Sequence, residues 1–109
     1  MEELKIHYFK ILNKKWTIRV LANDQYELTN GEGSVGTTDP NHALIDLSES
    51  GVTEETITHE LVHAYMHELC LGSINDISKE DFEEIFAEFM SKRGKELLLL
   101  SKRIYNKLK

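Results

Sequence analysis

Two histidines and a glutamate in one short segment have the residue types and the spacing of a metal-dependent hydrolytic site. His59 and His63 are four residues apart, and Glu60 directly follows the first histidine. On a helix, residues four apart lie one turn above each other on one face, so both imidazoles could bind one zinc ion. Glu60 would project toward the space in front of the metal, where a general base acting on zinc-bound water must sit. If the segment is helical, it therefore predicts zinc-assisted hydrolysis.

The residues around this segment predict the helix that would hold these side chains. Thr53 is a suitable N-cap, and Glu54 and Glu55 complement the positive end of the helix in its first turn. We expect the helix to run from about residue 54 to residue 70 and to stop at Gly72. Its core face would consist of four apolar residues, Ile57, Leu61, Ala64 and Leu69.

A catalytic zinc ion keeps three protein ligands and one open position, so the two histidines need a partner. His67 continues the same helical register. It is excluded, because three side chains spaced four apart span ~12 Å of helix axis and cannot all reach one ion. The candidates therefore lie on a second predicted helix and are all glutamates: Glu80, Glu83, Glu84 and Glu88.

The chain before the zinc-binding segment predicts strands. Residues 4–12 fit either a helix or a strand, but residues 15–21 alternate, with Trp16, Ile18 and Val20 on one face. We therefore expect a hairpin of residues 6–12 against 15–21, with a tight turn at Asn13-Lys14.

The next part of the chain is polar and rich in glycine up to Gly36, which is typical of a loop from residue 22 onward. Residues 34–37 could form a short strand. Residues 42–47 alternate again and predict the last strand before the zinc-binding helix.

The C-terminal part predicts two helices. Ser78 is a suitable N-cap, followed by acids in the first turn. The apolar stripe of this helix is formed by Phe82, Ile85, Phe86, Phe89 and Met90. Near Gly94 the helix should end or bend, and a last helix should cover residues 95–108.

The predicted fold is therefore α+β, and we expect residues 1–109 to form a single domain. A small antiparallel, or mixed, sheet of three to four strands precedes the helix with the two histidines, a helix that carries the glutamates, and a C-terminal helix.

Composition limits the partners and the compartment. The net charge of −6 argues against nucleic-acid binding. Residues 92–109 hold seven Lys and Arg against the single acid Glu96, which indicates a solvated helix face or a surface for an acidic partner. The single cysteine, Cys70, fits a packed thiol in a reducing compartment. Neither a signal peptide nor a membrane-spanning run is present, so we expect a cytoplasmic protein without membrane contacts.

The segment Glu84-Ile85-Phe86-Ala87-Glu88 resembles the zinc-ligand helix of the gluzincins, the thermolysin-like zinc peptidases. In that class a glutamate about twenty residues beyond the second histidine completes the metal site, and an acid four residues later supports one of the histidines. The resemblance implies that Glu84 is the third ligand and Glu88 the supporting acid. Glu83 flanks the apolar stripe more closely and remains the alternative ligand.

The chain also resembles the minimal zinc metallopeptidases of phages and bacterial mobile elements that are related to the ImmA/IrrE type. The similarity runs from the Trp16 strand through Gly36-Thr37-Thr38-Asp39 and the Ile45 strand to His-Glu-Leu-Val-His and the Glu84 helix. It implies a zincin fold and a zinc-dependent peptidase with a polypeptide substrate.

The function expected from the sequence is peptide-bond hydrolysis by a zinc-activated water, with Glu60 as general base. The substrate would lie along an exposed sheet edge, for which residues 42–47 are the expected strand. Candidate donors to the oxyanion are Tyr65, Tyr105 and His42. The alternatives are a non-catalytic, zinc-stabilised phage or mobile-element protein that binds a host or repressor protein, and a chance match on a surface helix.

Overall fold

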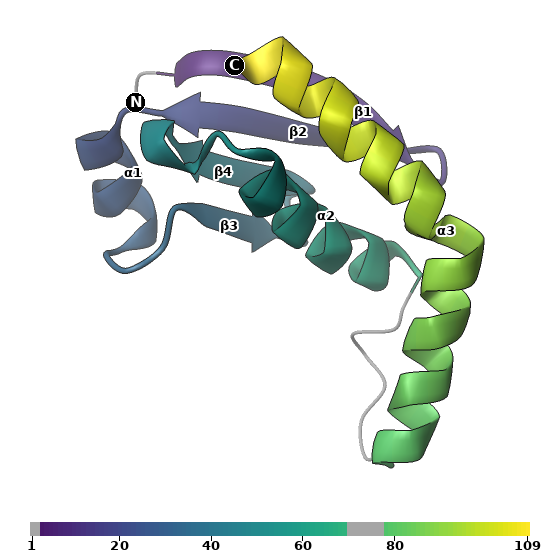
Figure 1. Cartoon of the computed structure of the whole chain (residues 1–109). Coiled ribbons are helices and arrows are strands. Elements are labelled where there is room, and N and C mark those ends of the chain that lie inside the picture. Colours follow the sequence, from purple (N-terminus) through teal and green to yellow (C-terminus); the bar gives the residue numbers. More distant parts are fainter. Residues whose placement is uncertain (1–2, 70–77) are drawn as a thin grey trace.

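A mixed four-stranded sheet carries the helices in the computed structural model, which describes residues 3–69 and 78–109 (Figure 1). The strands are β1 (Glu3–Ile11), β2 (Lys14–Leu21), β3 (Gly36–Asp39) and β4 (Leu44–Ser48). The helices are α1 (Asn23–Asn30), the short 3-10 helix η1 (Glu49–Gly51), α2 (Glu54–Glu68) and α3 (Lys79–Leu108). The sheet order is β1-β2-β4-β3, with β2 and β4 parallel and the other neighbours antiparallel. The predicted α+β class is confirmed, and the sheet is of the mixed kind.

The predicted hairpin is confirmed as β1 and β2. Its two-residue connection is formed by Leu12 and Asn13, one position earlier than expected, with φ values of 49° and 74°. Positive φ at both positions is the conformation that matches the twist of paired strands. The alternation of β2 places Trp16, Ile18 and Val20 in the core.

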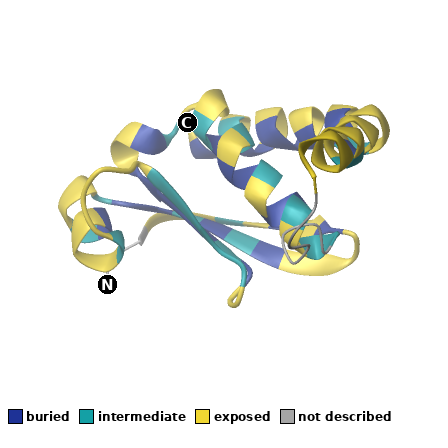
Figure 2. Cartoon of the chain, turned by 90° about the horizontal axis from the view of Figure 1, so that it is seen from below, coloured by how far each residue is buried: buried dark blue, intermediate teal, exposed yellow. Residues whose placement is uncertain are grey.

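Helices α2 and α3 cover one face of the sheet, and this interface forms the hydrophobic core (Figure 2). From the sheet side, Trp16, Ile18, Ile45 and Leu47 are buried. From the helices, the core receives the apolar residues Ile57, Leu61, Ala64, Leu97 and Ile104. The Thr53 side chain accepts a hydrogen bond from the Thr56 amide, as expected of the N-cap of α2.

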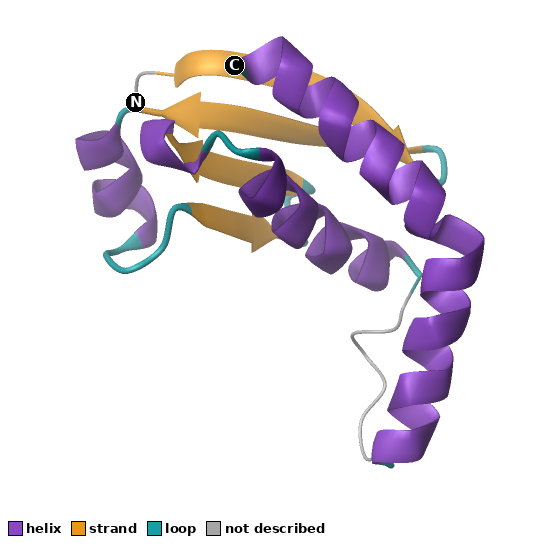
Figure 3. Ribbon diagram, viewed as in Figure 1, coloured by secondary structure: helices purple, strands orange, loops and turns teal. Residues whose placement is uncertain are grey.

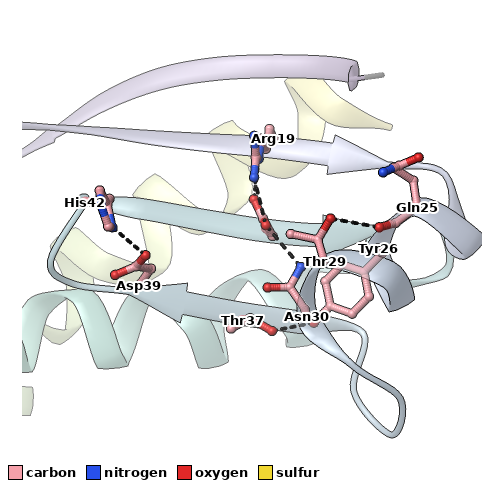
Figure 4. Close-up of polar contacts among 9 residues, drawn as sticks. Arg19, Gln25, Tyr26, Thr29, Asn30, Thr37, Asp39 and His42 are labelled. Carbon is pink, nitrogen blue, oxygen red and sulfur yellow. Dashed lines mark hydrogen bonds and ion pairs between the residues drawn. The ribbon is translucent and has the colours of Figure 1, made fainter. Parts of the chain in front are cut away.

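The segment that was expected to be a loop contains α1, so that prediction was wrong. Hydrophobic periodicity could not reveal this helix, because Tyr26 is its only buried residue and Leu28 is 81% exposed. Polar contacts hold it instead. The Tyr26 hydroxyl shares hydrogen bonds with Ser34 and Thr37, whose side chain lies on the sheet face opposite α2 (Figure 4).

A buried acid on the same face links α1 to two neighbouring strands. Asp46 of β4 accepts hydrogen bonds from Arg19, its register partner on β2, and from Asn30 at the end of α1 (Figure 4). Asp46 is only 5% exposed. Arg19 donates two of these bonds and Asn30 one, and together they offset the cost of burying the carboxylate, so the polar face of the sheet is specified as well as the apolar one.

The strand expected at the edge of the sheet is an interior strand. β4 pairs with β2 on one side and with β3 on the other, so the strand predicted from residues 42–47 has no free edge. The free edge next to α2 belongs to β3. Local alternation could not show this, because the parallel β2–β4 pairing joins segments that are distant in the chain.

The two predicted C-terminal helices are one continuous helix, α3, which bends near its middle (Figure 3). The Ser78 side chain caps it by accepting a hydrogen bond from the Asp81 amide. Gly94 is buried inside the helix and does not end it. The prediction of a separate last helix was therefore wrong, whereas the predicted bend agrees with the picture.

Two predictions concern residues that the structure does not describe. The expected helix stop at Gly72 and the packed thiol of Cys70 both lie between residues 69 and 78. Among the described helices, none combines the length and the apolar character needed to cross a membrane.

Two glycines should respond in opposite ways to alanine. A β-carbon on Gly51 would lie 2.2 Å from the Val35 carbonyl oxygen, which also accepts the Ser48 amide. Because a backbone atom must move, Gly51→Ala should lower the free energy of unfolding by roughly 1–3 kcal/mol. At Gly94 the nearest atom is the flexible Met90 Cε, at 3.1 Å. Gly94→Ala should raise stability by up to about 1 kcal/mol, as for glycine in a helix interior. Urea unfolding would measure both, and equal effects of the same sign would contradict this packing.

Candidate active site

His59 and His63 lie side by side on the exposed face of α2. Their Nε2 atoms are 3.3 Å apart, and the rings meet edge to face with centroids 5.0 Å apart. Two nitrogens that both bind the same tetrahedral zinc ion, each at 2.0–2.1 Å, would be about 3.3–3.4 Å apart. The same distance lets one ring donate a hydrogen bond to the other. The distance between the two nitrogens therefore matches the distance between two histidine ligands of one zinc ion.

Glu60 points into the same region but is held in a different environment. Glu60 is only 6% exposed and therefore buried, whereas both histidines are exposed. The Thr38 hydroxyl donates to Glu60 Oε1 at 2.8 Å and lies 3.2 Å from the Glu60 carbonyl oxygen. The other oxygen, Oε2, is 4.0 Å from His59 Nε2. One carboxylate oxygen is therefore anchored to the sheet, and the other lies beside the histidines.

Close approach of β3 to α2 requires the glycine at position 36. A β-carbon there would lie 2.9 Å from Thr56 Cγ2 and 3.2 Å from Glu60 Oε2. Alternation along β3 turns Gly36 and Thr38 to the same face. At the site, Gly36 therefore leaves space for α2, and Thr38 provides a hydroxyl. Sequence reasoning assigned neither residue. A glycine inside a strand, which often marks such an approach, was the available signal.

The histidines and Glu60 line a cleft of about 770 Å³ between β3 and α2. Pro40, at the end of β3, and Met66 and His67, one turn beyond His63, extend its wall. His67, which was excluded as a ligand of the same ion, is exposed and lines this cleft. The cleft leaves room for a large ligand in front of the two imidazoles.

The structure does not bring the predicted third ligand to the pair. Within residues 3–69 and 78–109, no third histidine, cysteine, aspartate or glutamate joins His59 and His63 in a group that could hold a metal. Glu83 and Glu84 are exposed on the first half of α3, which projects beyond the rest of the fold (Figure 1). Glu88 pairs with Lys92 at 2.8 Å, which lowers the pKa of Glu88. The assignment of Glu84 stays a prediction.

The three candidate oxyanion donors lie away from the cleft lining. Tyr65 is buried and donates to Glu96 at 2.6 Å, and burial together with this bond raises its pKa. Tyr105 is half-buried and packs against the core. His42 is exposed and binds Asp39 at 2.7 Å, which lowers the pKa of Asp39 (Figure 4). Among the described residues that line the cleft, Thr38 and His67 are the ones outside the predicted set whose side chains there carry polar hydrogens.

Comparisons of the chain with protein-family models, with curated proteins and with solved structures found no match. The chemistry assigned to this site therefore depends on the arrangement of its own residues.

The Thr38–Glu60 bond should be measurable as a coupling energy. Thr38→Val keeps the shape of the side chain but leaves the buried Glu60 carboxylate without this donor. It should lower the free energy of unfolding by about 1–3 kcal/mol. In a Glu60→Gln background the loss should be smaller, because no charge is left unpaired. Thr29→Val, which removes an exposed hydroxyl bonded within α1, is the control. Equal losses in both backgrounds would contradict a direct bond.

Proposed function

We propose that this chain is a zinc-dependent peptidase in which His59 and His63 hold the metal and Glu60 is the general base. The observation that carries the proposal is the 3.3 Å separation of the two Nε2 atoms, with a buried carboxylate oxygen 4.0 Å from one of them. Two paired imidazoles and an adjacent acid are what this chemistry needs. The resemblance to gluzincins and to phage metallopeptidases of the ImmA/IrrE type points in the same direction.

Glu60 would perform the proton transfers. The bound metal would supply Lewis acidity, which polarises a peptide carbonyl and makes water a better nucleophile near neutral pH. Glu60 Oε2, 4.0 Å from His59 Nε2, would take the proton of the attacking water and return a proton to the departing amine nitrogen. Thr38 holds the other oxygen, so the carboxylate keeps one orientation during both transfers.

Glu84 is the proposed third ligand, with Glu83 as the alternative and Glu88 as the supporting acid. Each of these roles requires the first half of α3 to approach the cleft. We propose that the protein acts in the cytoplasm and that its substrate is a polypeptide.

A second candidate is a zinc-stabilised protein that binds a partner without cutting it. The observation in its favour is the basic C-terminal segment, residues 92–109, whose seven Lys and Arg against one acid offer a surface for an acidic partner. Glu60 favours the peptidase, because a structural zinc site needs no base and closes its coordination with a fourth side chain.

Metal content and cleavage, measured on matched variants, separate the two candidates. Wild-type protein purified without chelator should hold about one zinc per chain, as for a single site, and should cleave an unfolded protein. Glu60→Gln should keep the metal and lose cleavage by at least about a hundredfold. His63→Ala should lose the metal, whereas His42→Ala should change neither property. Elemental analysis and mass spectrometry of the digests provide the readouts.

Two outcomes would decide against the peptidase. Wild-type protein without zinc would remove both candidates. One zinc per chain with no cleavage of any unfolded protein would favour the second candidate.

A Glu84→Gln chain that binds zinc as tightly as wild type would remove Glu84 from the ligand set.

A further inference from the structure

The cleft continues on the other side of Glu60. A second hollow of about 280 Å³ shares Gly36, His59 and Glu60 with the first and adds Ser34 and Glu55. The two hollows therefore meet at the proposed reacting groups. A ligand could extend from the centre in both directions.

This groove follows α2 along its length. At one end, Gly36 lies against Thr56 and Glu60. In the middle, Thr38 bonds Glu60, and at the far end Pro40 faces the same hollow as Met66. β3 thus runs beside α2 in the same direction (Figure 1), with its unpaired edge along the groove. An extended polypeptide can add to such an edge through main-chain hydrogen bonds.

The two ends of the groove differ in chemistry. Glu55 contributes an exposed carboxylate to the smaller hollow, and none of the described residues lining either hollow is Lys or Arg. At the opposite end, Met66 and Pro40 provide apolar surface, and a methionine side chain adapts to ligands of different shape. The Glu55 end therefore favours a positively charged group of the ligand, and the Met66 end favours a large apolar group.

We propose that the groove selects extended polypeptides with a basic side chain at the Glu55 end and a large apolar side chain at the Met66 end. The proposal rests on the proposed function, since it places the scissile bond between the two. Glu55 and Met66 are eleven positions apart on α2, which is about 16 Å of helix axis. An extended chain rises about 3.3 Å per residue and alternate side chains point to the same side, so the two selected side chains should be about four or six residues apart.

Glu54 provides a matched control for the charge. Both acids lie in the first turn of α2 and complement the helix dipole equally. Both are exposed, but only Glu55 lines the groove. A charge reversal at each position thus separates recognition of the ligand from a general effect on the helix or on net charge.

The test uses peptide binding to the zinc-loaded Glu60→Gln chain, followed by fluorescence polarisation. A peptide with Lys and Leu at the proposed spacing should bind roughly two- to five-fold more tightly than versions with Glu for Lys or Ser for Leu, as for a partly exposed charge pair. Adding Glu55→Lys should reverse the preference between the Lys and Glu peptides. Adding Glu54→Lys should leave the preference unchanged.

Equal affinity for all the peptides, no measurable binding of any of them, or equal effects of the two reversals would overturn the selectivity. Cleavage of the same peptides by wild-type protein is a separate readout. Selective binding without cleavage would overturn the peptidase and keep the recognition groove. Cleavage without selectivity would overturn the recognition groove and keep the peptidase.

Discussion

The hydrogen bond from Thr38 to the buried carboxylate of Glu60 ties the edge of the sheet to the helix that carries the histidines. A carboxylate that loses water without gaining partners costs several kcal/mol. Glu60 can therefore stay buried only while β3 remains close, and β3 can come close only because position 36 has no side chain. The width of the cleft and the position of the histidine pair both depend on this contact.

The opposite face of α2 keeps the helix in the same place. Ile57, Leu61 and Ala64 are fully buried against the sheet and α3. Thr58 shares a hydrogen bond of 2.7 Å with the buried Ser101 of α3. Because apolar contacts fix one side of the helix and a polar contact fixes the other, the histidines are presented on a support with little freedom. Such preorganisation is what a metal or catalytic site requires.

Features specified by neighbouring residues could be predicted from the sequence. The hairpin, the capped helix and the clustering of His59, Glu60 and His63 all follow from short-range periodicity. Helix α1 could not be found that way, because hydroxyl and amide contacts and not an apolar face hold it. The interior position of β4 and the role of Thr38 depend on pairing between distant segments. Local patterns do not encode that pairing.

The position of the third ligand could not be predicted from local sequence patterns either. The spacing of Glu84 and Glu88 fits a known ligand pattern, yet α3 runs on unbroken through Gly94 and its first half extends beyond the rest of the fold. Phe89 packs on Tyr65, so the helix joins the core only from that point onward. Whether a glutamate reaches the histidines is decided by the path of α3, which helix periodicity alone does not specify.

The most direct test of a shared metal site is a zinc titration followed by NMR of the histidine ring nitrogens. We expect the Nε2 resonances of His59 and His63 to shift together and to saturate at one zinc per chain. Those of His7 and His42, outside the cleft lining, should stay constant. Independent shifts of the two rings, or saturation with only one of them affected, would contradict a metal site shared by His59 and His63.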